Sequence, residues 1–163
     1  MKAIELDGVT FSYGRGKCHV LDGIGLSCEK GTVNALIGLN GCGKTTLIKV
    51  MAGLEVPSAG TVQYSGRSIF DMTFRERSSV LAYVSQNYRS LGDHLVKDYI
   101  LFGTASRIGA FDMPGQDEKR AAKEVLERFD LSRLAERRLG ELSGGERQIV
   151  SICSAIVQDS DAL

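Results

Sequence analysis

The sequence predicts an α/β protein in which an antiparallel β-subdomain leads into a strand–loop–helix unit with a glycine-rich loop, and a helical subdomain follows. Three observations lead to this prediction. Residues 2–13 alternate apolar and polar side chains, as half-buried strands do. Residues 33–37 form a short, mostly apolar run directly before the glycine-rich residues 38–43. From about residue 88 to residue 142 the pattern is helical.

The composition indicates one globular domain. With 163 residues, 43% of them hydrophobic, the chain is long enough for one domain with a core and too short for two. Twenty basic residues balance twenty acidic ones, which argues against a nucleic-acid partner. The amino terminus lacks the apolar run of a secretion signal and no stretch reaches membrane-spanning length, so we expect a cytosolic chain. The four cysteines have no metal-ligand spacing, and we expect reduced thiols.

Short strands and one helix are expected in the first half of the chain. Val9, Phe11 and Tyr13 fall on one face of the first strand, and the glycines of residues 14–16 then break the pattern. A helix after the glycine-rich loop is expected to end near Gly53. The other expected ranges are strands at 24–28, 33–37, 61–64 and 80–84 and the helix itself at 45–51.

The helical subdomain is expected to contain two helices, one at 95–102 and one that begins near Gln116, with Pro114 and Gly115 between them. Apolar residues of the second helix recur at i, i+3, i+4 and i+7, which predicts a stripe facing a core rather than a cofactor site. The stripe consists of Ala122, Val125, Leu126 and Phe129.

Residues 38–45, GLNGCGKT, fit the pattern G-x-x-x-x-G-K-[ST] between an expected strand and an expected helix, and we call them the phosphate loop. Glycines allow consecutive backbone N–H groups to surround phosphate oxygens at the positive end of the helix dipole. Lys44 is then expected to reach the β- and γ-phosphates, and the Thr45 hydroxyl to bind Mg²⁺. The alternative is a tight strand-to-helix turn without a ligand. The residues predicted to contact nucleotide here are Gly38, Asn40, Gly41, Cys42, Gly43, Lys44, Thr45 and Thr46.

Residues 142–148, LSGGERQ, begin a second helix of interest. Ser143 followed by Glu146 forms a capping box, which by itself needs no ligand. Apolar residues on one face of this helix are expected to pack against a core. They are Ile149, Ile152, Cys153 and Ile156.

Together with the phosphate loop, LSGGERQ resembles the signature motif of the ATP-binding-cassette (ABC) ATPases, and this resemblance spans nearly the whole chain. It implies a P-loop NTPase (RecA-like) core with an antiparallel β-subdomain and a helical subdomain, divided at residues 1–87, 88–142 and 143–163. It implies ATP and Mg²⁺ as cofactors. It also implies a head-to-tail dimer, in which the signature helix of one domain meets the nucleotide held by its partner. The residues so implied are Ser143, Gly144, Gly145 and Gln148.

Two further residues match the ABC family by position. Tyr13 lies where the family has an aromatic side chain that stacks on adenine; the alternative is a strand core residue beside Phe11. Gln86 lies where the family has a glutamine that senses Mg²⁺ and the γ-phosphate and couples to the membrane partner. Gln86 and Thr45 are therefore the predicted metal contacts.

The short segment between Gln86 and Ser143 favours a transport-type ATPase over DNA-repair relatives, which carry a long coiled coil there. Residues 96–103 and 139–161 look like those of importers of iron-siderophore, haem or cobalamin type. The resemblance implies a transmembrane permease subunit as partner, a substrate-binding protein as a further one, and a place on the inner face of the cell membrane. A non-hydrolysing nucleotide-binding fragment and a soluble ABC ATPase acting on ribosomes or DNA are the alternatives.

The family's magnesium-associated Asp and catalytic Glu end a strand that is expected beyond Leu163, and neither His19 nor His94 matches its switch histidine. The sequence is therefore expected to be truncated before these residues, with no catalytic residue in residues 1–163. Without a positioned general base, hydrolysis falls by about 10²- to 10⁴-fold. We expect negligible ATPase activity from this chain alone.

Overall fold

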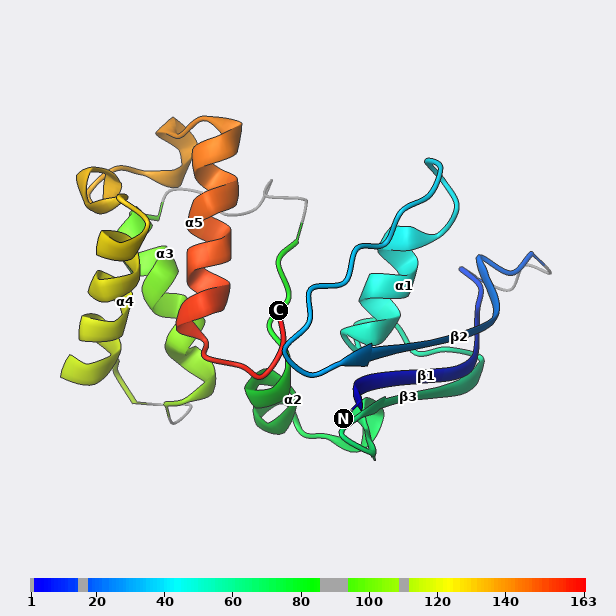
Figure 1. Cartoon of the computed structure of the whole chain (residues 1–163). Coiled ribbons are helices and arrows are strands. Elements are labelled where there is room, and N and C mark those ends of the chain that lie inside the picture. Colours follow the sequence, from blue (N-terminus) through cyan, green and yellow to red (C-terminus); the bar gives the residue numbers. More distant parts are fainter. Residues whose placement is uncertain (1, 15–17, 86–93, 109–111) are drawn as a thin grey trace. The chain divides into compact units, whose positions relative to one another are not determined.

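The computed structural model describes residues 2–14, 18–85, 94–108 and 112–163. It contains two compact units, residues 1–73 and residues 74–163, and each is described here by itself (Figure 1). The first unit combines a β-sheet with a helix, and the second is helical. This combination confirms the predicted α/β class. No helix in the described part of the chain is both long and apolar enough to cross a membrane.

The first unit is built on a four-stranded antiparallel sheet in the order β2-β1-β3-β4. Leu6 at its centre pairs with Leu26 on one side and Val62 on the other, so apolar side chains line the buried face. The expected strands at 2–13, 24–28 and 61–64 are confirmed. The strand bounds are Lys2–Phe11 for β1, Leu21–Glu29 for β2, Ala59–Tyr64 for β3 and Arg67–Ser68 for β4.

Helix α1 (Lys44–Met51) follows the phosphate loop, as expected, and the short helix η1 (Ile69–Asp71) closes the unit. Leu47 and Val50 of α1 are buried. The Tyr64 hydroxyl of β3 donates to the carbonyl oxygen of Met51 at 3.2 Å, which ties the sheet to the end of α1. Burial raises the pKa of this tyrosine well above its ordinary value.

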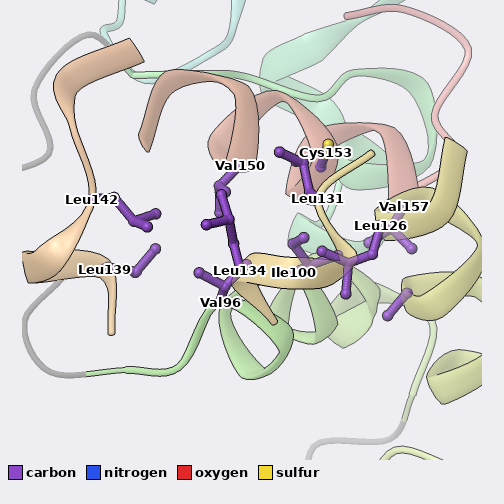
Figure 2. Close-up of a cluster of buried hydrophobic side chains, with 11 residues drawn as sticks. Val96, Ile100, Leu126, Leu131, Leu134, Leu139, Leu142, Val150, Cys153 and Val157 are labelled. Atoms are coloured by element: carbon purple, nitrogen blue, oxygen red, sulfur yellow. The ribbon is translucent and has the colours of Figure 1, made fainter. Parts of the chain in front are cut away.

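The second unit packs α3, α4 and α5 around one apolar core, which Figure 2 shows in close-up. Val96, Ile100 and Val150 in this core are fully buried. The expected helices at 95–102 and from Gln116 are confirmed. The helix bounds are Phe74–Val80 for α2, Val96–Phe102 for α3, Gln116–Arg128 for α4, Gly144–Val157 for α5, Gly103–Ser106 for η2, Ser132–Leu134 for η3 and Leu139–Glu141 for η4.

Two expected strands are not formed. Residues 33–37 have no regular secondary structure, and Val33 and Ile37 are 101% and 90% exposed. A buried strand needs hydrogen-bonded neighbours, and no described segment pairs with this one. At 80–84, α2 instead continues to Val80, and only Leu81 forms a bridge, parallel to Ala162.

The packed faces of two helices differ in part from the expected ones. On α5 the core face is Val150, Cys153 and Val157, whereas Ile149 is 41% exposed. On α4, Ala122 and Leu126 are buried and Phe129 is 37% exposed. Both helices carry more apolar positions than one face holds, so the neighbouring helices decide which positions are buried.

Candidate functional site

The phosphate loop has a backbone that requires glycine at two positions. Gly41 and Gly43 have φ angles of +82° and +93°, which side chains rarely allow. A Cβ on Gly43 would lie 2.9 Å from the carbonyl oxygen of Val20 and 3.2 Å from Leu21 Cδ2. The loop therefore lies directly against the start of β2 as it enters α1.

Lys44 places its ammonium group inside the loop. Its Nζ donates to the carbonyl oxygens of Gly38 at 2.8 Å and Leu39 at 2.7 Å, and lies 3.8 Å from Cys42 Sγ. These are weak partners for a cation compared with a phosphate oxyanion. The ammonium is therefore held close to the glycine backbone, where its positive charge favours an anion.

The first turn of α1 offers further groups to an anion. N–H groups at the start of a helix have no partner within the helix, and the macrodipole adds positive potential there. Asn40, Cys42 and Thr45 are exposed around this turn, whereas Thr46 is buried. The Thr45 hydroxyl is thus accessible to a metal ion that is bound mainly by phosphate oxygens and water, as Mg²⁺ commonly is. The described residues contain no cluster of three acidic, His or Cys side chains that would hold a metal by themselves.

Tyr13 lies beside the phosphate loop. Its hydroxyl is 3.3 Å from Thr46 Oγ1, and its ring meets Phe11 edge-on, with ring centroids 4.9 Å apart. The side chain follows the end of β1 and is 52% exposed, so it is not a strand core residue. An exposed aromatic ring at this position offers apolar surface for stacking on another flat group.

The signature motif forms the start of α5 in the second unit. Ser143 is the N-cap and accepts from the Glu146 N–H at 3.3 Å, while Glu146 Oε2 accepts from the Ser143 N–H at 2.9 Å and from its hydroxyl at 2.8 Å. These hydrogen bonds, with Arg133 at 3.6 Å, hold the pKa of Glu146 below its ordinary value. The predicted capping box is confirmed.

Gly144 and Gly145 have no steric role within the described chain. A Cβ on either would meet no atom within 4 Å, and neither has a positive φ. Glycine in a helix costs about 0.5–1 kcal/mol relative to alanine. The two glycines and the exposed Gln148 therefore leave an open surface at the positive end of α5.

Gln86, the predicted metal sensor, lies outside the described residues. Thr45 is thus the one predicted metal contact that the structure places. Sequence reasoning missed the support that Val20 gives to Gly43 and the contact of Tyr13 with Thr46. Both depend on how the β1–β2 hairpin lies against the loop, and local sequence carries no signal for this.

A glycine loop at a helix N-terminus that holds the ammonium of a lysine against its own carbonyl oxygens defines a nucleotide-binding protein of the P-loop class. Residues 21–163 match the sequence pattern of the ABC transporter family, and the chain belongs to this family.

The chain is similar to ATP-binding proteins of several transport systems. The chain is 34% identical over 161 residues to the sulfate/thiosulfate import ATP-binding protein CysA of Methylococcus capsulatus, with 99% of this chain and 45% of that protein covered. It is 30% identical over 161 residues to a probable iron chelatin transport ATP-binding protein of Helicobacter pylori, with 98% and 62% covered. A solved structure of a putative metal-chelate type ABC transporter superposes with a TM-score of 0.80 at 27% identity, with 97% and 56% covered. The chain thus spans about half to two thirds of their lengths.

Proposed function

We propose that the chain binds ATP with Mg²⁺ and forms the ATP-binding part of a membrane importer. The observation that carries the proposal is the phosphate loop, in which Lys44 Nζ lies 2.8 Å and 2.7 Å from loop carbonyl oxygens next to the first turn of α1. An anion with several negative oxygens satisfies the loop N–H groups and the ammonium at the same time. A triphosphate fits this arrangement.

Each loop group has a distinct proposed task. The N–H groups of residues 41–46 hold phosphate oxygens, with Gly41 and Gly43 giving the backbone its curvature. Lys44 moves from its carbonyl partners to the β- and γ-phosphates, and Thr45 presents its hydroxyl to Mg²⁺. Bound Mg²⁺ would neutralise phosphate charge. Tyr13 presents its exposed ring to the adenine.

The signature helix is proposed to bind the nucleotide of a second copy or a related domain. Glycine destabilises a helix, yet no steric contact within the described residues requires glycine at positions 144 and 145. Close approach of an external anion to the backbone of α5 gives them a reason, and Ser143 is placed at the same helix start. Gln148, one turn further along, is exposed beside them.

Transport is proposed for the longer protein rather than for residues 1–163 alone. The relatives' names describe different solutes: import of sulfate or thiosulfate in one and transport of iron chelatin in another. A metal chelate is the proposed cargo here, because residues 96–103 and 139–161 resemble such importers and a structural neighbour is of metal-chelate type. The proposed partners are a permease, through which the protein lies on the inner membrane face, and a substrate-binding protein.

Equilibrium binding of ATP to the wild-type chain and two lysine variants tests this proposal. Lys44→Ala removes the ammonium of the loop, and Lys49→Ala removes one from the last turn of the same helix. We expect Lys44→Ala to weaken ATP binding about 10- to 100-fold, as the loss of a charge-assisted hydrogen bond does, and Lys49→Ala to change it less than about twofold. No binding of ATP at millimolar concentration by the wild type, or equal binding by all three, contradicts the proposal.

A further inference from the structure

Strand β1 changes the face that it buries part-way along its length. Ile4 and Leu6 are buried in its first half, and strict alternation would keep the even-numbered positions inside along the whole strand. In the second half, however, the odd-numbered Val9 and Phe11 are the buried residues. The two halves of β1 are therefore out of step by one residue.

The pairing of β1 with its neighbours contains the extra residue. Leu6 pairs with Leu26 of β2 and Val9 with Ile24, so β1 advances three residues (9 − 6) while β2 advances two (26 − 24). The pairing with β3 is also irregular between residues 7 and 10 of β1. One extra residue on a strand is a β-bulge, and it exchanges the two faces of the strand beyond it.

Two glycines form the bulge. Gly8 has a φ of +58°, and a Cβ on Gly60 of β3, whose φ is +85°, would overlap the carbonyl group of Gly8. Beyond the bulge, the Tyr13 ring packs edge-on against the buried Phe11, and its hydroxyl lies 3.3 Å from Thr46 Oγ1 of α1. The bulge therefore sets the side of β1 on which the Tyr13 ring lies, which is the side of α1.

Thr10 fastens β1 between the bulge and Tyr13. Its hydroxyl oxygen accepts from the Gly23 N–H of β2 at 3.1 Å. Its carbonyl oxygen accepts from the Ser58 N–H at 2.8 Å and from the Ser58 hydroxyl at 3.0 Å, directly before β3. Thr10 is thus bonded to segments on both sides of β1. An aromatic ring whose backbone is already held loses less conformational entropy when a base stacks on it.

We propose that Thr10 is a positioning residue for Tyr13, which holds the end of β1 behind the bulge so that the exposed ring stays where adenine stacks on it. The inference rests on the proposed ATP binding and adds to it a residue that acts without touching the nucleotide. Thr10 should therefore affect the adenine contribution to affinity and leave the phosphate contribution unchanged.

Dissociation constants for ATP and for inorganic tripolyphosphate separate the two contributions, because both probes carry a triphosphate chain and only ATP carries a base. Thr10→Val removes the hydroxyl and keeps the branched shape of the side chain. The matched control is Thr10→Ser, which keeps the hydroxyl that accepts from Gly23. Tyr13→Ala removes the ring and gives the size of the whole adenine effect.

We expect Thr10→Val to bind ATP about 3- to 10-fold more weakly than the wild type, and tripolyphosphate within about twofold of it. Thr10→Ser should bind both probes like the wild type. In a chain that already carries Tyr13→Ala, Thr10→Val should weaken ATP binding no further, because the ring on which it acts is gone.

Unchanged ATP binding by Thr10→Val overturns the positioning role, and so does an equal loss for both probes, which would be a general effect on the first unit. Equal losses in Thr10→Val and Thr10→Ser, or a further loss in the Tyr13→Ala background, overturn it as well. A wild-type chain that binds neither probe contradicts the proposed phosphate loop, and unchanged ATP binding by Tyr13→Ala contradicts the proposed role of the Tyr13 ring.

Discussion

Gly43→Ala should damage the phosphate loop through both its backbone angle and a steric contact. Gly43 has a φ of +93°, and a left-handed conformation costs a residue with a Cβ about 1–2 kcal/mol. Its Cβ would also lie 2.9 Å from the Val20 carbonyl oxygen, and overpacking of this kind costs about 1–3 kcal/mol. The sum, about 2–5 kcal/mol, is a large part of the stability of a small domain. We expect the loop to shift and ATP affinity to fall at least about tenfold.

Gly66→Ala is the matched control for this substitution. Gly66 has a φ of +82°, yet a Cβ there would meet no atom within 4 Å, and it lies in the β3–β4 turn. The Gly66→Ala variant should lose only about 1–2 kcal/mol of stability, from the left-handed backbone conformation, and should bind ATP as tightly as the wild type. Urea unfolding and ATP titration of both variants provide the comparison. If Gly43→Ala is no less stable than Gly66→Ala and binds ATP equally well, the derived loop geometry is wrong.

Three further predictions concern single side chains. Cys42 is exposed at the loop and should be alkylated faster than Cys153, because burial raises the pKa of the Cys153 thiol to about 11. Bound ATP should slow the alkylation of Cys42. Equal alkylation rates for the two cysteines and no protection by ATP would contradict this prediction. Glu146→Gln should lower the melting temperature at neutral pH and progressively less in acid. The lowered pKa of Glu146 contributes stability that begins to fall below the ordinary pKa of a glutamate and is lost as the pH falls through the lowered pKa; a pH-independent difference would refute this. In urea unfolding, Val150→Ala should lower the free energy of unfolding by about 1.5–3 kcal/mol and Ile149→Ala by less than about 1 kcal/mol. The reverse order would mean that Ile149, as expected from the sequence, lies on the packed face of α5.

Local patterns in the sequence were sufficient to predict several elements. The alternation of residues 2–13 predicted β1, and the glycine loop predicted the start of α1. Helix α4 followed from its periodicity and from the Pro114–Gly115 break before it. In each case the residues that form the element also carry the signal.

Tertiary partners decided the rest. Residues 33–37 are apolar enough for a buried strand, but burial of a strand depends on neighbours that the described residues do not supply. On α5 the apolar residues are spread over Ile149 as well as Val150, and only packing against α3 and α4 selects the latter. The hydrogen bond between Tyr13 and Thr46 likewise depends on how the β1–β2 hairpin folds back, which no local pattern encodes.

The most direct test of the central claim is a series of dissociation constants for adenosine, AMP, ADP and ATP, measured on the wild-type chain with Mg²⁺ present. Binding through Lys44 and the loop amides requires the β-phosphate, so ADP and ATP should bind at least about 10-fold more tightly than AMP and adenosine. Equal affinity for adenosine and ATP would mean that the phosphate loop does not hold the nucleotide, and it would contradict the account.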